Sequence, residues 1–180
     1  EVAEGLDEVR TLVGGTIRSI RGVTRNLRPV ALDDLGLLPA LRALARDLAG
    51  PGGAMEIHFE TPPRIPDPDA DTELALYRSV QEALANAVRH GGAREAWITL
   101  RTDETGIDLE VRDDGSGVPE GFRIEGNSRH SGLAGIRERV TALGGRVEIG
   151  PRPDGGTRLA LWVPWSHPAP AAAPTTPETT

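Results

Sequence analysis

The chain has 180 residues, enough for one ordinary domain and an extra element but not for two full domains. Its formal net charge of −7 argues against non-specific binding to nucleic acid or to an anionic membrane as its main role. The absence of cysteine excludes disulfides, thiolate chemistry and cysteine metal sites.

Residues 2–28 are predicted to form one long amphipathic helix. Its apolar residues recur at spacings of three and four: Val2, Leu6, Val9, Val13, Ile17, Ile20, Val23 and Leu27. Such a seam packs against a partner helix or against the helix's own domain, and the sequence leaves both open. Arg28-Pro29 ends the helix, because the residue before a proline is biased away from helical angles. Residues 29–36 are predicted to be a linker.

Two helices and a strand are predicted next. A helix runs from Leu37 to Leu48, and residues 55–60 alternate like a strand. Four prolines make residues 61–71 a loop. The helical pattern of residues 73–90 then has Asp71 or Thr72 as its N-cap and Gly91-Gly92 as its stop.

The remaining pattern predicts a two-layer α/β sandwich. In chain order it comprises strands 96–100 and 107–111, a glycine-rich loop 114–132, a helix 133–143 and strands 146–149 and 158–163. Strands linked by hairpins are expected to be antiparallel, each with one apolar face. The three helices can cover that face. The Pro-, Ala- and Thr-rich tail, residues 166–180, is expected to be disordered.

Four polar residues share one side of the helix 73–90. At about 100° per residue, Glu82, Asn86, Arg89 and His90 fall within an arc of about 100°, opposite the apolar side. An amide oxygen can ligate Mg²⁺, a carboxylate can order a water, and arginine neutralises phosphate. A solvated helix face is the competing interpretation.

A second polar cluster, Asp113-Asp114-Gly115-Ser116-Gly117, follows an apolar strand. A carboxylate at a strand end can accept a hydrogen bond from an exocyclic amine such as adenine N6. Glycines let the backbone approach a ring or a phosphate closely. The alternative, a calcium loop, is disfavoured because an EF-hand begun at either aspartate lacks the required ligands.

A third candidate is the loop that leads into the helix 133–143. Ser131-Gly132-Leu133 at a helix N-terminus offers free N–H groups and a positive dipole end to phosphate. An ordinary loop–helix junction explains the same residues. The sequence contains neither a P-loop nor a Rossmann fingerprint.

Together with Gly155-Gly156-Thr157, these three groups of residues form four sequence motifs, or boxes, that resemble those of the Bergerat-type ATPases. That superfamily comprises gyrase, heat-shock chaperone, MutL and histidine kinase ATP domains. The boxes, in order, are Glu82-x-x-x-Asn86-x-x-Arg89-His90, Asp113-x-Gly115-x-Gly117, Gly132-Leu133 with Arg137-Glu138-Arg139, and Gly155-Gly156-Thr157. The stretches 27–37 and 75–90 are similar to sensor kinases of the NarX/DesK/LiaS type. The resemblance covers about residues 1–164 and implies a mixed sheet covered by helices on one face, preceded by a long N-terminal helix.

By matching position, the resemblance implies a role for each site residue. Asn86 binds Mg²⁺ and Glu82 supports the metal or polarises the reacting group; Arg89 and His90 contact phosphate. Asp113 holds adenine N6, Gly115 and Gly117 line the base, and Thr157 lies near Asp113 through a water. Residues 118–131 form a short mobile lid, and Gly132 with Leu133 closes over the phosphates. The implied cofactors are ATP and Mg²⁺.

The resemblance divides the chain into residues 1–28, the second helix of a dimerisation hairpin, a linker 29–36, an ATP-binding domain 37–165 and a tail 166–180. Its implied partners are a histidine-bearing dimerisation helix, a response regulator and a second copy in a full-length homodimer, with no nucleic acid. The expected location is the bacterial cytoplasm, as part of a sensor that can be membrane-anchored.

No histidine of the chain matches the phosphoacceptor expected in such kinases. None of His58, His90, His130 and His167 is followed by an acidic residue. The first residue is Glu1, so we expect an excised fragment that binds ATP·Mg²⁺ but does not phosphorylate itself. Three alternatives stay open: an anti-sigma-type serine kinase, an ATP-gated conformational ATPase and a degenerate binding module. The linker resemblance disfavours the first and the intact boxes disfavour the last.

Overall fold

The computed structural model describes residues 28–49, 55–122 and 131–165 of the chain. The helices are α2 (Val30–Leu35), α3 (Leu37–Ala49), α4 (Ala70–Asn86), the π-helical turn η1 (Ala87–Gly91) and α5 (Ser131–Ala142). The strands are β1 (Glu56–Glu60), β2 (Glu95–Thr102), β3 (Gly106–Asp113), β4 (Arg146–Pro151) and β5 (Thr157–Pro164). All five predicted strands and the three predicted core helices are confirmed, with shifted ends.

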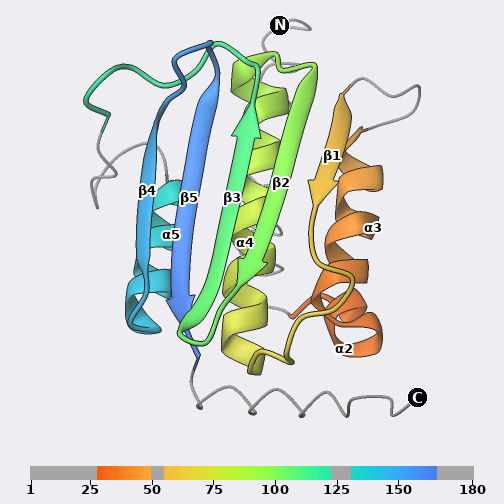
Figure 1. The fold of residues 1–180 in the computed structure, drawn as a ribbon. Coiled ribbons are helices and arrows are strands. Elements are labelled where there is room, and N and C mark those ends of the chain that lie inside the picture. The colour runs from red at the N-terminus through yellow and green to blue at the C-terminus, as the bar shows by residue number, and fades with distance from the viewer. Residues whose placement is uncertain (1–27, 50–54, 123–130, 166–180) are drawn as a thin grey trace, which may run out of the picture.

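The five strands form one mixed sheet in the order β1-β2-β3-β5-β4. β2, β3, β5 and β4 pair antiparallel, as expected for strands linked by hairpins. β1 pairs parallel to β2 at the edge of the sheet. Helices α3, α4 and α5 all lie on one face of this sheet (Figure 1). The predicted two-layer α/β sandwich is therefore confirmed.

The core lies between the sheet and these helices. In β2 and β3 the apolar residues at alternate positions are buried: Ala96, Ile98, Leu100, Ile107, Leu109 and Val111 are each at most 4% exposed. The apolar side of α4 meets them through Leu76, Tyr77, Val80 and Leu84. The apolar face of the strands, which repeats every two residues, thus packs against the apolar face of the helix, which repeats every 3.6 residues, as the sequence pattern predicts.

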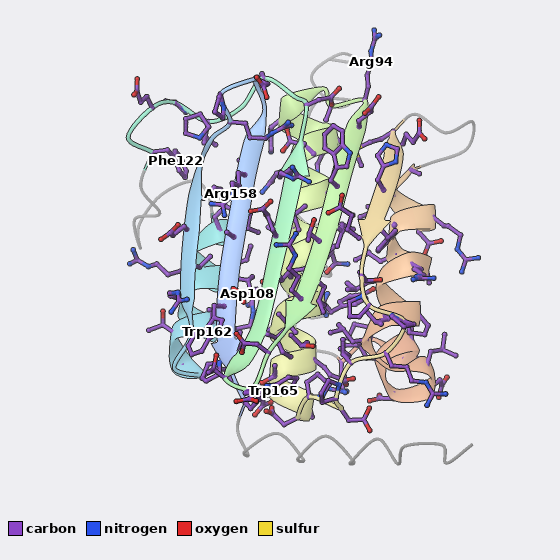
Figure 2. All side chains as sticks on the ribbon, in the orientation of Figure 1. Arg94, Asp108, Phe122, Arg158, Trp162 and Trp165 are labelled. Carbon is purple, nitrogen blue, oxygen red and sulfur yellow. The ribbon has the colours of Figure 1, made fainter. Side chains whose placement is uncertain are left out.

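The other face of the sheet is covered by no helix in the described part of the chain and carries charged and aromatic side chains (Figure 2). Asp108 on β3 pairs with Trp162 on β5 across the strands. Glu110 on β3 accepts a hydrogen bond from Arg158 on β5, with the Oε2 to Nε distance 2.5 Å. Opposite charges in neighbouring strands balance each other on this face.

Helix α4 begins earlier than the sequence indicated. Its N-cap is Asp69, whose carboxylate accepts hydrogen bonds from the N–H groups of Asp71 and Thr72. The prediction of Asp71 or Thr72 as the cap is wrong, because Asp69 has extended backbone angles and reaches both amides from outside the helix. The predicted stop is confirmed at Gly92, which has a φ of 60°.

Two other boundaries differ from the expectation. Residues 30–35, predicted as part of a linker, form helix α2, whose Leu32 is buried in the core. The last predicted helix begins at Ser131 rather than Leu133, so Gly132 lies in the first turn of α5. The predicted long helix, the tail and most of the predicted lid lie outside the described residues.

Candidate functional site

Three segments meet at one end of the sheet: the end of β3, the end of α4 with η1, and the β4–β5 turn (Figure 1). These three segments carry most of the residues that the sequence pattern singled out. The sheet determines this meeting, because β3 pairs with β5 and α4 packs behind β3. Residues distant in sequence are therefore brought to one place.

Asp113 is the last residue of β3 and is only 7% exposed. Strand alternation turns its side chain to the helix-covered side, the side of Leu109 and Val111. Its Oδ1 accepts hydrogen bonds from the Gly115 N–H at 2.9 Å and the Thr157 N–H at 3.3 Å. Both of its side-chain hydrogen bonds within the described residues end on Oδ1, which leaves Oδ2 available to a ligand. Thr157, which was expected to lie near Asp113 through a water, contacts the Asp113 carboxylate directly through its backbone N–H.

Glycines hold the chain around Asp113 by backbone contact. A Cβ on Gly115 would lie 2.8 Å from the Gly91 carbonyl oxygen, and one on Gly117 would lie 2.8 Å from the Gly156 carbonyl oxygen. A Cβ on Gly156 would lie only 1.9 Å from the Asp113 carbonyl oxygen, and Gly156 has a φ of 87°. Only glycine fits there without displacing the backbone. Gly115 therefore lies beside Asp113, and Gly117 lies against Gly156 of the β4–β5 turn.

Gly91 connects this cluster to the polar side of α4. Its carbonyl oxygen accepts the Ser116 N–H at 2.9 Å, which joins the end of η1 to the loop after β3. A Cβ built on Gly91 would lie 3.8 Å from both the Asn86 carbonyl oxygen and Asp113 Oδ1. Asn86 and Asp113 therefore flank the same glycine. The sequence pattern indicated only a helix stop at Gly91, since its contact with Ser116, so distant along the chain, leaves no local pattern.

The four polar residues of the helix 73–90 fall into two pairs. Glu82 and Asn86 are one turn apart on α4, so they lie on the same side, and both are partly buried. Arg89 and His90 lie on η1 and are exposed. The π-helical turn changes their direction relative to a continuous α-helix, and such turns are frequent at functional sites. Gly91, which ends η1, lies near Asp113 Oδ1, so the C-terminal end of this helix is the end near Asp113.

The first turn of α5 meets Glu82. A Cβ on Gly132 would lie 1.8 Å from Glu82 Oε1, so the Glu82 carboxylate sits directly against the Gly132 backbone. A negative charge is favourable at a helix N-terminus. The neighbouring Leu133 is 6% exposed and packs in the core, which leaves only its backbone to face a ligand.

Asp114 has a structural role distinct from that of its neighbour. Its Oδ1 accepts the Arg94 N–H at 2.7 Å and the Glu95 N–H at 2.9 Å, at the start of β2. The hydrogen bond from the Glu95 amide, with that from Arg94, lowers the pKa of Asp114 below its ordinary value. Of the adjacent carboxylates, therefore, Asp113 faces the site and Asp114 ties its loop to β2.

Asn86 and Glu82, one turn apart on α4, carry oxygen atoms of the kind that Mg²⁺ takes as ligands. No group of three His, Asp or Glu side chains able to hold a metal ion occurs among the described residues. Mg²⁺ is commonly held by one or two protein oxygens together with substrate phosphates. Asn86, with Glu82 one turn away, fits that arrangement.

Two hollows on the described surface lie away from these residues. One, of about 750 Å³, is on the open face of the sheet; the other, of about 500 Å³, lies between α3 and β1. Asp113 and the glycines beside it line neither hollow. No helix within the described ranges combines the length and apolar content needed to span a bilayer.

Comparison with known proteins agrees with this geometry. The family model "Histidine kinase-, DNA gyrase B-, and HSP90-like ATPase" matches residues 71–167. The signal transduction histidine-protein kinase/phosphatase DegS of Brevibacillus brevis is 30% identical over 166 residues, 91% of this chain and 42% of DegS. Sensor histidine kinase ComP of Bacillus subtilis is 38% identical over 152 residues, 83% of this chain and 19% of ComP. The chain thus spans less than half the length of these curated relatives.

Solved structures share the fold. The ATP-binding domain of PrrB from Mycobacterium tuberculosis is 30% identical, with a TM-score of 0.55, over 73% of this chain and 92% of that one. Full-length ShkA in complex with AMPPNP is 27% identical, with a TM-score of 0.58, over 76% of this chain and 31% of that one. The chain therefore belongs to the family of histidine kinase-, DNA gyrase B- and HSP90-like ATPases, as a catalytic ATP-binding domain of the sensor histidine kinase type.

Proposed function

We propose that this domain binds ATP·Mg²⁺ with the base at Asp113 and the phosphates beside Asn86, and that the longer protein transfers the γ-phosphoryl group to a histidine. The observation that carries the proposal is the buried Asp113 carboxylate, held through Oδ1 by two backbone amides. Its Oδ2 suits one exocyclic amine. Gly91 places this carboxylate next to the end of α4.

Recognition of adenine follows from the chemistry of Asp113. An ionised carboxylate only accepts hydrogen bonds, so it selects a ring with an amine at this position. Guanine presents a carbonyl oxygen at the corresponding place, which a carboxylate repels. Gly115 and Gly117 keep the backbone beside Asp113 free of side chains, which supports their role in lining the base. Thr157 orients the carboxylate through its N–H.

The phosphate end lies along α4 and η1. The Asn86 side-chain oxygen is the proposed Mg²⁺ ligand, supported indirectly by Glu82, and bound Mg²⁺ neutralises phosphate charge during transfer. Arg89 and His90 are exposed at the end of the same helix, where they can contact phosphate oxygens. Gly132 and the backbone of Leu133 offer N–H groups at the start of α5.

The acceptor and the partners belong to the longer protein. Because none of the four histidines is followed by an acidic residue, the acceptor is proposed to lie on a dimerisation helix outside this sequence. A response regulator then receives the phosphoryl group, and the dimer works in the bacterial cytoplasm. The names of DegS and ComP support a histidine kinase rather than a serine kinase or a conformational ATPase on the same fold.

Calorimetric titration of the 180-residue chain with ATP and Mg²⁺ tests the nucleotide site. Asp113→Asn should weaken ATP binding about tenfold or more, the cost of a lost hydrogen bond to a charged group. Asp114→Asn is the matched control, because its carboxylate faces β2, and it should retain affinity. Equal affinity of Asp113→Asn and wild type would refute the assigned base site.

Phosphoryl transfer is tested on the parent-length protein with γ-labelled ATP. Asn86→Ala should abolish labelling, because the proposed Mg²⁺ ligand is lost, whereas wild type should form acid-labile phosphohistidine. Equal labelling of the two proteins contradicts the Mg²⁺ role. Acid-labile phosphate on the 180-residue chain alone would contradict the absence of an acceptor from it.

A further inference from the structure

Arg152 reaches the main chain of Asp113 from the β4–β5 turn. Its Nη1 donates to the Asp113 carbonyl oxygen at 2.6 Å, across 39 residues of sequence. Arg152 also closes its own turn: its N–H donates to the Gly156 carbonyl at 3.0 Å, and the Gly155 N–H donates to the Arg152 carbonyl at 3.1 Å. One residue therefore shapes the turn and attaches it to β3.

Trp97 supports the Arg152 guanidinium. The guanidinium carbon lies 5.1 Å from the centre of the Trp97 ring, within the range of a cation–π contact. Trp97 is itself flanked by its cross-strand neighbours on the open face of the sheet. The His58 ring stacks on it at 5.7 Å and the Arg112 guanidinium lies over it at 5.8 Å. These neighbours restrict the Trp97 ring, which makes it a fixed platform for Arg152.

The turn that Arg152 holds also contacts the Asp113 carboxylate. Thr157, which follows the turn, donates its N–H to Oδ1 at 3.3 Å, near the long end of the range for such a bond. Gly156 lies against the Asp113 carbonyl oxygen. A small shift of the turn would therefore break the Thr157 contact and leave the Asp113 carboxylate held through Oδ1 by the Gly115 N–H alone, so that its orientation is less fixed. The Arg152 hydrogen bond opposes that shift.

We propose that Arg152 is a positioning residue for base recognition: seated on Trp97, it holds the β4–β5 turn against β3 so that Asp113 presents Oδ2 in one orientation to the exocyclic amine of adenine. This inference rests on the proposed function, because it requires Asp113 to bind the base. It assigns Arg152 no contact with the nucleotide itself. Its effect passes through Asp113 and Thr157. Loss of Arg152 should therefore act on recognition of the amine and spare the phosphates.

The test compares ATP with purine riboside triphosphate, which lacks the 6-amino group but has the same phosphates. Affinities of both, with Mg²⁺, are measured by calorimetry on the 180-residue chain. Wild type should prefer ATP, and Arg152→Ala should reduce that preference about tenfold, the size of one hydrogen bond to a charged group. Trp97→Leu should reduce it less, because the hydrogen bond of Arg152 remains.

Arg146→Ala is the matched control. Arg146 lies over Trp162 at 4.6 Å on the same face of the sheet, so it makes the same kind of contact without reaching Asp113. Its removal should leave the preference for ATP unchanged. Arg152→Lys should restore part of the preference, because lysine can still donate to the Asp113 carbonyl. If Arg152→Ala does not fold, as judged by its thermal melt, Arg152→Lys and Trp97→Leu carry the comparison.

The outcomes separate the inference from the proposed function. If Asp113→Asn abolishes the preference for ATP and Arg152→Ala leaves it intact, the positioning role is wrong and the base site stands. If Arg152→Ala weakens both nucleotides equally, Arg152 acts on the phosphates or on the fold, and the inference is also overturned. If Asp113→Asn keeps the wild-type preference, the base site itself is wrong.

Discussion

The N-terminal end of helix α4 is held by side chains, whereas its C-terminal end is held by glycine backbone. At the N-terminal end, Asp69 caps the helix, and Arg28 contacts Asp33, the Ala70 carbonyl and Glu73. At the C-terminal end, Gly91 receives the Ser116 N–H and lies against Gly115. The candidate nucleotide residues are all at the second end.

This difference indicates which end tolerates change. A side-chain contact can be lost or replaced while the backbone keeps its path, and an exposed ion pair contributes little free energy. The close backbone contacts at Gly115, Gly117 and Gly156 have no such freedom, because a Cβ on any of these three would meet backbone atoms at 2.8 Å or less. We therefore expect substitutions at the glycine end to affect both folding and nucleotide binding, and those at the capped end to affect stability alone.

The largest effect is expected for Gly156→Ala. The new Cβ would meet the Asp113 carbonyl oxygen at 1.9 Å, at a φ of 87°. Strain and overpacking together should lower the free energy of unfolding by about 2–5 kcal/mol and abolish ATP binding. Urea denaturation and calorimetry measure the two effects.

Gly155→Ala provides the matched control for this substitution. Gly155 has the same φ of 87°, but nothing lies within 4 Å of its Cβ position. Gly155→Ala should lower the free energy of unfolding by only about 1–2 kcal/mol, the cost of a side chain in a left-handed backbone conformation. The variant should still bind ATP. Equal losses at the two positions would show that conformation, rather than close backbone approach, governs this turn.

At the N-terminal end of α4, Asp69→Ala should lower the free energy of unfolding by about 1 kcal/mol, the usual value of an N-cap. The Asp71 and Thr72 amides lose their acceptor. The affinity for ATP should not change, as judged by titration of the folded protein. Asp67→Ala, in the exposed loop before the cap, is the control and should be neutral. A lower affinity of Asp69→Ala for ATP would contradict the expectation that the N-terminal end of α4 affects stability alone.

A smaller effect is expected for the Arg28 contacts. Arg28→Ala should lower the free energy of unfolding by about 0.2–1 kcal/mol, because its ion pairs with Asp33 and Glu73 are exposed or only partly buried. The cost should shrink as salt is raised, since screening weakens such pairs. A double-mutant cycle with Glu73→Gln, run by urea denaturation at two salt concentrations, isolates that pair. A coupling energy unaffected by salt would argue against an electrostatic contact.

The smallest effect is expected from the exposed Asp114, and it depends on pH. Because folding lowers the pKa of Asp114, its stabilisation is present above the unfolded value of about 3.9 and is lost as the pH falls through the folded value. Wild type should exceed Asp114→Asn in stability from pH 7 to about pH 5, and the difference should shrink in more acid solution. A difference that stayed constant down to pH 2 would show that the charge of Asp114 contributes nothing.

Local patterns predicted the helices, the strands and their buried faces. The burial of Leu76, Val80 and Leu84 on α4 follows from spacing alone, and so does that of Ile98 opposite them. Element ends were less predictable, because they depend on single side chains. The cap at Asp69 and the short helix α2 were missed for this reason: Asp69 precedes the helical pattern, and Leu32 is buried only once α3 and the sheet are in place.

By itself the sequence determined the two-layer fold, the family and the identity of Asn86, Asp113 and their glycines as candidates. These depend on residue type and on spacing along one chain. Only the tertiary structure decided that Gly91 joins Asn86 to Asp113, that Glu82 meets Gly132, and that Arg152 holds the turn beside Asp113. The physical reason is that these contacts connect residues dozens of positions apart, and packing of the helices on the sheet determines their distances.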